Sequence, residues 1–161
     1  MRTAVFLAIT CMDSQPYLNY DQPITGEYDQ KIPRVLLIMR WDGKFGFPGG
    51  WVDEGETPEQ ALIREVREEI NYVLFKGEYK QVHEEIVGER RTILYHTDVT
   101  VDRLKGILDM ASGADHYESE VCGIVTPNLI PGSLEHVLNL PFAYSAGHQL
   151  EMLMRDLRII S

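Results

Sequence analysis

Cysteine is scarce in this chain of 161 residues, which contains only Cys11 and Cys122. Two thiols so far apart provide neither a disulfide framework nor the paired spacing of a zinc-binding motif. We therefore expect both cysteines to be reduced and buried.

Long hydrophobic runs are also missing. The longest ones, near Val35–Met39 and Ala4–Thr10, are far too short to cross a bilayer. The first residues lack the basic region and long apolar segment that mark a signal peptide. These absences predict a protein without a membrane partner that resides in the cytosol, or in the nucleus if the host has one.

Basic residues are fewer than acidic ones, and the formal net charge is −10 at pH 7. A protein that binds long nucleic acids needs a broad basic surface, so this charge argues against a protein of that kind. Binding of one nucleotide or of a capped RNA end stays open, since local arginines and a metal ion can supply positive charge there. The length fits a single domain over residues 1–161 that can bury a real core.

The most informative segment covers residues 49–72, where a glycine turn leads into a capped helix. Thr57 is a good N-cap, Pro58 suits the first helical position, and Gln60 completes a capping box with Thr57. Asn71 can adopt the left-handed conformation that ends a helix. These signals predict a helix over residues 58–70.

Three glutamates, Glu65, Glu68 and Glu69, share one side of this predicted helix, next to its apolar stripe. Like charges so close repel one another, and a divalent cation among them would relieve the repulsion. The simpler alternative is that they keep a surface helix soluble. Their position after a glycine turn and beside a buried stripe favours the cation. Arg64 is placed to form a salt bridge with an acid of the preceding loop, Glu56.

This segment resembles the Nudix box, G-x5-E-x7-R-E-U-x-E-E-x-G-U, in which U is a bulky apolar residue. Order and spacing are kept at Gly50, Glu56, Arg64, Glu65, Val66, Glu68 and Glu69. Asn71 replaces the final glycine of the pattern, and asparagine tolerates the same positive φ. The chain is therefore similar to the Nudix hydrolases.

The resemblance extends to both sides of the box. Residues 40–50 lead into it, and His116, the run of residues 120–123 and a C-terminal helix with Gln149 follow it. Together they resemble the Nudix branch that includes the snoRNA-decapping enzyme, which also hydrolyses inosine diphosphates. Phe6 stands where that branch has a histidine that helps to hold the purine, so the resemblance does not carry inosine selectivity over to this chain.

The resemblance implies cleavage of a nucleoside diphosphate linked to another group, by attack of water at phosphorus, with Mg2+ or Mn2+ neutralising the developing charge. It assigns the metal to Glu65, Glu68 and Glu69 and to the backbone carbonyl of Gly49 or Gly50. It also implies an α+β protein with the Nudix fold, an α/β/α sandwich around a central mixed β-sheet. A homodimer is one state that the family adopts.

Further site residues are proposed with their alternatives. Glu120 could be an extra metal ligand or the base that takes the proton of water, and it could equally be an exposed carboxylate at the end of a strand. Arg40 ends a buried strand beside the box, where it could contact a phosphate or base or simply face solvent. Phe47 could stack on a nucleobase or pack in the core.

Two later residues complete the candidate substrate site. Gln149 could reach the base from the last helix, or be an ordinary solvated helix residue. His116 belongs to an Asp-His pair that the resembling branch shares, which makes it a candidate substrate contact. As a group, the histidines at 83, 96, 116 and 148 show no metal-binding spacing, and each is more often a surface or core residue than a ligand.

Outside the box helix, the pattern predicts strands at residues 3–10, 34–40, 76–87, 91–101 and 120–126. It predicts helices at residues 102–111, 133–139 and 145–158. Residues 112–119 read as a polar loop. The long segment Asp13–Pro33 reads as a hairpin excursion or a flap over the site, because loops of this length are usually functional or disordered.

Three hypotheses for function remain. The first is a pyrophosphatase that acts on small nucleotides, and the second is an RNA-decapping enzyme. The third is a nucleotide-binding module without catalysis, which the three intact glutamates argue against. The net charge favours the first over the second, and a basic groove near Arg40, Lys44, Arg90 and Arg91 would reverse that preference.

Overall fold

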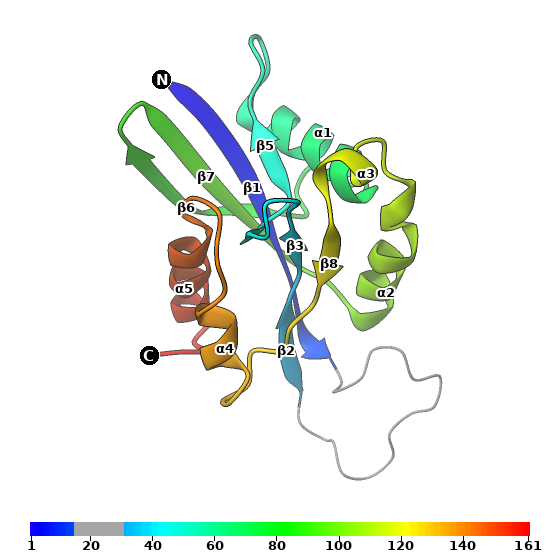
Figure 1. The fold of residues 1–161 in the computed structure, drawn as a ribbon, viewed down its shortest axis with the longest axis vertical. Coiled ribbons are helices and arrows are strands. Elements are labelled where there is room, and N and C mark those ends of the chain that lie inside the picture. Colours follow the sequence, from blue (N-terminus) through cyan, green and yellow to red (C-terminus); the bar gives the residue numbers. More distant parts are fainter. Residues whose placement is uncertain (15–30) are drawn as a thin grey trace.

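The computed structural model describes residues 1–14 and 31–161 (Figure 1). Two β-sheets and the helices packed against them form this part of the chain. Residues 15–30, the greater part of the segment Asp13–Pro33 with its predicted role as a flap, lie outside the described residues.

The larger sheet is built around β1 (Arg2–Ser14), which is longer than the strand that the sequence predicted. β1 pairs in parallel with β7 (Arg90–Asp98) and antiparallel with both β2 (Ile32–Val35) and β5 (Gly49–Trp51). β6 (Lys80–Val87) extends this mixed sheet by an antiparallel pairing with β7. Because β5 pairs with the first half of β1, the start of the box is fixed to the centre of the fold.

A second, smaller sheet consists of β3 (Leu37–Met39) between β4 (Phe45–Gly46) and β8 (Gly123–Val125). The prediction of one strand over residues 34–40 was therefore wrong, because its two halves belong to different sheets. Leu36 lies at the division, and its N–H still donates to the carbonyl of Ile9 in β1. A continuously apolar run is compatible with burial in either sheet, so hydrophobicity alone did not reveal the break.

Helix α1 (Pro58–Ile70) has the boundaries that the sequence predicted. The Thr57 side chain accepts a hydrogen bond from the Gln60 N–H, and the Gln60 side chain accepts one from the Thr57 N–H. Asn71 ends the helix in the left-handed conformation, with φ 56°. Both ends of the helix are therefore fixed by local hydrogen bonds and backbone geometry.

The remaining helices are α2 (Val101–Met110), the short turn η1 (Ala111–Gly113), α3 (Tyr117–Glu120), α4 (Leu134–Leu138) and α5 (Ala146–Asp156). Placing Glu120 at the start of a strand was wrong, because it ends α3 and β8 begins only at Gly123. The cause is a tertiary contact, in which the His116 N–H donates to the Glu68 carbonyl and holds α3 against α1.

Two hydrophobic cores lie on opposite faces of the larger sheet. One contains Val5, Leu7 and Ile9 of β1 with residues of α1 and α2, and the other contains Ala8 and Leu94 with residues of α5. Alternate side chains of β1 point to opposite faces, as expected of a strand. The arrangement is the α/β/α sandwich with a mixed sheet that the resemblance implied (Figure 1).

Two expectations from composition can also be compared with the described residues. Both cysteines are free, with Cys11 buried and Cys122 only half-buried. Among the helices of the described segments, none has the length and apolar character needed to cross a membrane.

Candidate active site

Carboxylates from two helices meet beside the glycine turn. Glu65 and Glu69 of α1 and Glu120 of α3 each offer an oxygen atom, and these atoms all lie within 4.8 Å of one another. We call these three residues the acid cluster. Glu120 joins it because α3 packs against α1, so residues more than fifty positions apart along the chain share one site.

Glu69 is the most deeply placed acid of the cluster, with 7% of its surface exposed. Burial raises its pKa well above the ordinary value, and the nearby charges of Glu65 and Glu120 raise it further. One hydrogen bond favours the charged form, since the Gly49 N–H donates to Glu69 Oε1 at 2.9 Å. Burial also raises the pKa of Glu65, although the hydrogen bond and charge of Arg64 oppose that shift. A cation among these oxygens would stabilise the charged forms.

At both glycines of the turn an added side chain would clash, with the backbone of β1 at Gly49 and with the carboxylate of Glu65 at Gly50. A Cβ atom on Gly50 would lie 2.6 Å from the carboxyl carbon of Glu65. Gly49 has φ 152°, and a Cβ atom there would lie 2.0 Å from the carbonyl oxygen of Val5. The backbone of the turn can therefore approach both the acid cluster and β1 only because these residues are glycines.

Arg64 ties the loop before α1 to the acids on the helix. Its guanidinium group donates to both carboxylate oxygens of Glu56, at 2.8 and 2.9 Å, and to the carbonyl of Trp51 at 3.0 Å. It also donates to Glu65 at 2.9 Å and to Glu68 at 3.2 Å. The Arg64 hydrogen bond is the main reason that the pKa of Glu56 is lowered. Arg64 therefore orients the box and partly balances its negative charge.

Glu68, which the resemblance assigned to the metal, lies beside the acid cluster rather than within it. One of its oxygens contacts Arg64 and lies 3.4 Å from His116 Nδ1. The same nitrogen lies 3.6 Å from a carboxylate oxygen of Glu120. His116 thus contacts the acids of the site and does not line the neighbouring cavity, so its role in substrate binding remains a prediction.

A cavity of about 410 Å³ opens beside the acid cluster. Its walls include Arg40, Phe47 and Gln149, the three candidate substrate contacts that the sequence placed around the box. They also include Trp41, Asp42 and Tyr144, which sequence reasoning did not select. Trp41 and Asp42 follow Arg40 directly, and that adjacency was a usable signal. No pattern in the sequence placed Tyr144 here.

Gln149 is an unusual wall residue, because its side chain is polar and only 1% of the residue is exposed. Its Nε2 atom has no hydrogen-bond partner among the described residues. A buried donor without a partner costs about 1–3 kcal/mol, so an acceptor on a bound molecule would recover that free energy. Phe6 and Phe47 are also part of the cavity wall, and Phe47, with 5% of its surface exposed, packs in the same core as Ala8 and Leu94.

The atoms around the acid cluster suit a hard divalent cation. The cluster consists of carboxylate oxygens, and the backbone carbonyl of Gly49 or Gly50 as a further ligand stays a prediction. The cluster contains no sulfur or nitrogen ligand, and oxygen ligands of this kind are those that Mg2+ prefers. The residues present therefore fit a bound divalent ion.

Comparison with known proteins identifies the family. The sequence profile described as "Nudt16-like: U8 snoRNA-decapping enzyme-like" matches residues 11–160. The U8 snoRNA-decapping enzyme of Mus musculus is 31% identical over 139 residues, which are 78% of this chain and 70% of that protein. An 8-oxo-dGTP diphosphatase of Haemophilus influenzae is 42% identical over 62 residues, which cover 35% of this chain and 46% of that protein.

A solved structure supports the fold independently. The Nudix domain of Shewanella oneidensis NrtR, solved with ADP ribose, superimposes with a TM-score of 0.62 and 19% identity, covering 96% of this chain and 87% of that one. Nudix hydrolases as a group use divalent metals, in agreement with the carboxylates described above. The chain therefore belongs to the Nudt16-like family of Nudix hydrolases, and it is a hydrolase that acts on phosphate anhydrides.

Proposed function

We propose that this protein hydrolyses a phosphate anhydride bond in nucleoside di- or triphosphates, with Mg2+ or Mn2+ as the cofactor. The observation that carries the proposal is the position of the acid cluster at the wall of a cavity of about 410 Å³. A metal-binding group and a binding space for one small molecule are therefore adjacent. Cleavage at phosphorus needs both, because it depends on positioning and on neutralising charge.

Each acid has a distinct place in this proposal. Glu65 and Glu69 would hold the metal, which supplies positive charge to the phosphates when it is bound. Glu120 is half-exposed, with 50% of its side chain accessible, so it can meet solvent and accept a proton from the attacking water. Glu68 and Arg64 would keep the other carboxylates in position through the contacts already described.

The cavity wall favours a base that offers a carbonyl oxygen. Gln149 Nε2 is a donor without a partner, and an exocyclic carbonyl would accept its hydrogen bond. Phe47 lies on the same wall and can stack on the ring. We therefore expect inosine and guanosine nucleotides to be better substrates than adenosine nucleotides, whose amino group at the equivalent position is a donor.

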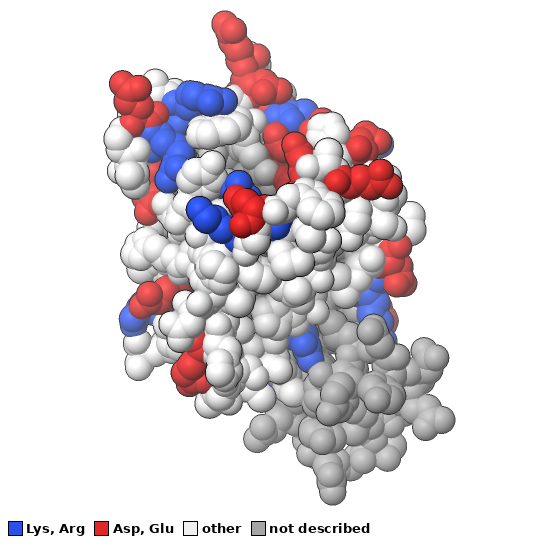
Figure 2. Space-filling model, viewed as in Figure 1, with Lys and Arg blue, Asp and Glu red and all other residues white. Residues whose placement is uncertain are grey.

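A second candidate is release of the cap nucleotide from a capped RNA, and the arginines around the cavity favour it. The guanidinium carbons of Arg40 and Arg90 lie 5.5 and 4.6 Å from the ring centroid of Tyr144, a residue of the cavity wall. Arg2 lies 4.0 Å over the ring of Trp51, another wall residue. Figure 2 shows basic side chains gathered near the start of β1 and the β6–β7 turn, although the whole molecule is acidic.

The deciding experiment measures product release from a panel of substrates. The panel contains inosine, guanosine and adenosine di- and triphosphates, dinucleoside polyphosphates, ADP-ribose and a capped RNA, each with Mg2+, with Mn2+ and with excess EDTA. Fast turnover of one small nucleotide that EDTA abolishes would support the first candidate. Preferential release of the cap nucleotide would support the second. Metal binding without turnover of any substrate would instead indicate a binding module.

Assembly and location belong to the same proposal. A homodimer is the assembly that we propose to test, and light scattering coupled to gel filtration would measure the mass directly. We also expect the protein in the cytosol, or in the nucleus of a eukaryotic host, which fluorescence microscopy of the tagged protein would test.

A further inference from the structure

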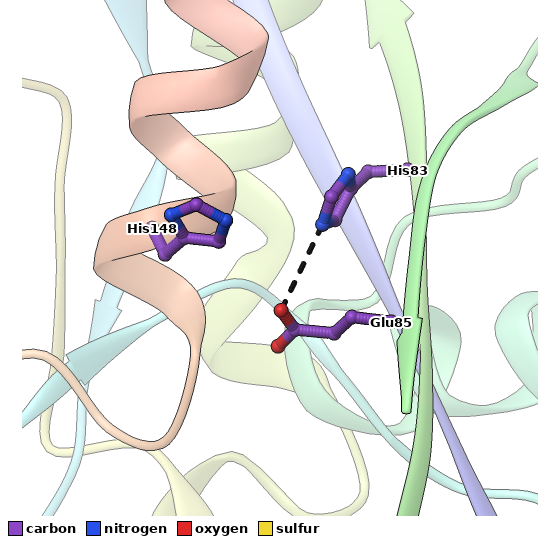
Figure 3. Close-up of side chains that lie close together, drawn as sticks. All are labelled: His83, Glu85 and His148. Carbon is purple, nitrogen blue, oxygen red and sulfur yellow. Dashed lines mark ion pairs between the residues drawn. The ribbon is translucent and has the colours of Figure 1, made fainter. Parts of the chain in front are cut away.

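A second cluster of side chains that can bind metal lies between the sheet and α5. It consists of His83 and Glu85 of β6 and His148 of α5, and we call it the histidine cluster. One ligand atom of each residue lies within 4.8 Å of the other two. Figure 3 shows the two strand residues and the helix residue pointing into the same space. None of these residues lines the cavity beside the acid cluster.

Local structure explains why two of the three residues face α5 together. His83 and Glu85 are two positions apart on a strand, so their side chains share one face. A bulge between Gln81 and His83 shifts the register of β6 against β7 just before this pair. The His83 and Glu85 side chains are each about one-fifth exposed, at 20% and 19%, whereas His148 is exposed. An ion can therefore enter from solvent.

Two buried polar atoms of this cluster have no hydrogen-bond partner within the described residues. Neither His83 Nε2 nor Glu85 Oε1 has a hydrogen-bond partner there, although both atoms are buried. The closest approach of His83 to Glu85 is 3.8 Å, from Nε2 to Oε2, which is too long for a hydrogen bond. The rings of His83 and His148 meet edge to face with centroids 5.8 Å apart. Buried polar atoms without partners are rare, and a bound ion is one explanation.

We propose that His83, Glu85 and His148 form a binding site for a divalent transition metal of the zinc class. Imidazole nitrogen and carboxylate oxygen are ligands that such ions accept, and two histidines with one carboxylate form a known zinc ligand set. Ligand atoms about 2.1 Å from a tetrahedral zinc lie roughly 3.4 Å apart. The present spacing of up to 4.8 Å needs only side-chain adjustments to reach that value.

This site differs in chemistry from the acid cluster. The histidine cluster supplies two nitrogen ligands and the acid cluster supplies none, so zinc should prefer the first and magnesium the second. Three protein ligands leave the fourth position of a tetrahedral ion for water. A bound ion would also join α5 to β6, because the ligands come from both elements.

The test is a zinc titration of the metal-free protein, purified without a histidine tag, in millimolar magnesium that occupies the oxygen site. Calorimetry measures affinity and stoichiometry, and cobalt in place of zinc reports tetrahedral nitrogen and oxygen ligands by its visible absorption. We expect one equivalent of zinc to bind. We also expect a rise in the unfolding midpoint of roughly 5–10 °C when zinc exceeds its dissociation constant about a hundredfold.

Variants that remove one ligand each separate this site from other histidines. His83→Asn, Glu85→Gln and His148→Asn should each weaken zinc binding about a hundredfold or more, whereas exposed His136→Asn on α4 serves as the matched control and should bind like the parent protein. Magnesium-supported hydrolysis by His83→Asn should be unchanged. Equal zinc affinity in the parent and all three cluster variants, or no zinc binding in excess magnesium, would overturn the proposal. Neither result depends on which nucleotide is hydrolysed.

Discussion

The acid cluster and the histidine cluster are both groups of three potential ligands, but the protein supports them very differently. Glu69 accepts a hydrogen bond from the Gly49 backbone, and Glu65 is held by Arg64. In the histidine cluster, His83 Nε2 and Glu85 Oε1 have no such partners among the described residues. The first cluster is thus held in position by hydrogen bonds from its surroundings, whereas two buried atoms of the second are without such bonds.

Helix α5 contributes to both regions through consecutive residues. Gln149 lies on the wall of the cavity, and His148 belongs to the histidine cluster. Successive helical residues differ by roughly 100° in direction, so one helix can serve two sites on adjacent sides. Changes at these two positions therefore test whether the sites are separable.

The largest effect should follow Glu69→Gln, which replaces the most buried carboxylate of the acid cluster by an amide. We expect the turnover number to fall at least about a hundredfold, because loss of a ligand removes several kcal/mol of stabilisation in the transition state. The metal-free protein should be no less stable, since a buried carboxylate is replaced by a neutral amide of the same shape. Initial rates and a thermal melt in EDTA measure the two effects.

Exposed Glu54→Gln, in the loop before α1, is the matched control for that substitution and should retain activity. If Glu69→Gln kept full turnover, the acid cluster would not be the metal site. Glu68→Gln tests whether an acid beside the cluster matters as much as one within it. Glu68 contacts Arg64 and His116 and is not one of the three acids of the cluster.

The next prediction concerns Arg64, whose hydrogen bonds hold the acids in position. Arg64→Lys keeps the charge but cannot reproduce the two hydrogen bonds to Glu56 together with the contacts to Trp51 and Glu65. We expect activity to fall roughly ten- to a hundredfold and the free energy of unfolding to fall by about 1–3 kcal/mol. Kinetics and urea unfolding would show both losses. Arg155→Lys, at an exposed pair with Glu151 on α5, should change neither.

A smaller effect is expected at the cavity wall. Gln149→Leu should raise KM about tenfold for a nucleotide whose base has a carbonyl oxygen, because one hydrogen bond is lost. It should leave the unfolding midpoint equal or higher, since the Nε2 atom has no partner among the described residues to lose. A KM that stays the same for every nucleotide would remove Gln149 from the binding site. Zinc affinity should not change in this variant, because Gln149 is not part of the histidine cluster.

The smallest effect concerns a histidine outside both clusters. Burial lowers the pKa of His96 below 6.5, and its Nε2 lies 2.8 Å from the Thr10 hydroxyl. Its contribution to stability should therefore be complete above pH 6.5 and decline as the pH falls through the lower pKa of the folded state. NMR of the ring protons measures this titration against a histidine peptide. Added zinc should shift the His83 and His148 signals and leave His96 unaffected.

The sequence best predicted the features that depend on interactions between residues close together in the chain. Thr57, Pro58, Gln60 and Asn71 gave the limits of α1 because each acts within one turn of the helix. Glu120 was placed in the wrong element because α3 depends on a hydrogen bond to Glu68, far away in the chain. Local patterns carry no information about such a contact.

Long-range pairing explains the other differences. His83 and His148 showed no ligand spacing because a strand and a helix distant in sequence bring them together. Tyr144 reaches the cavity from a loop with φ 49°, a conformation that its sequence did not signal. Between Arg34 and Arg40 every residue is apolar, so the change from one sheet to the other left no sign in the sequence.

The close fit of Gly50 against Glu65 limits how this enzyme could be altered by mutation. A single methyl group at residue 50 would lie 2.6 Å from the Glu65 carboxyl carbon, so even alanine must displace a residue of the acid cluster. Trp41 and Tyr144 are exposed residues of the cavity wall and make no such close fit. A mutant library that seeks new substrate preferences should therefore vary these wall positions and keep the glycine turn invariant.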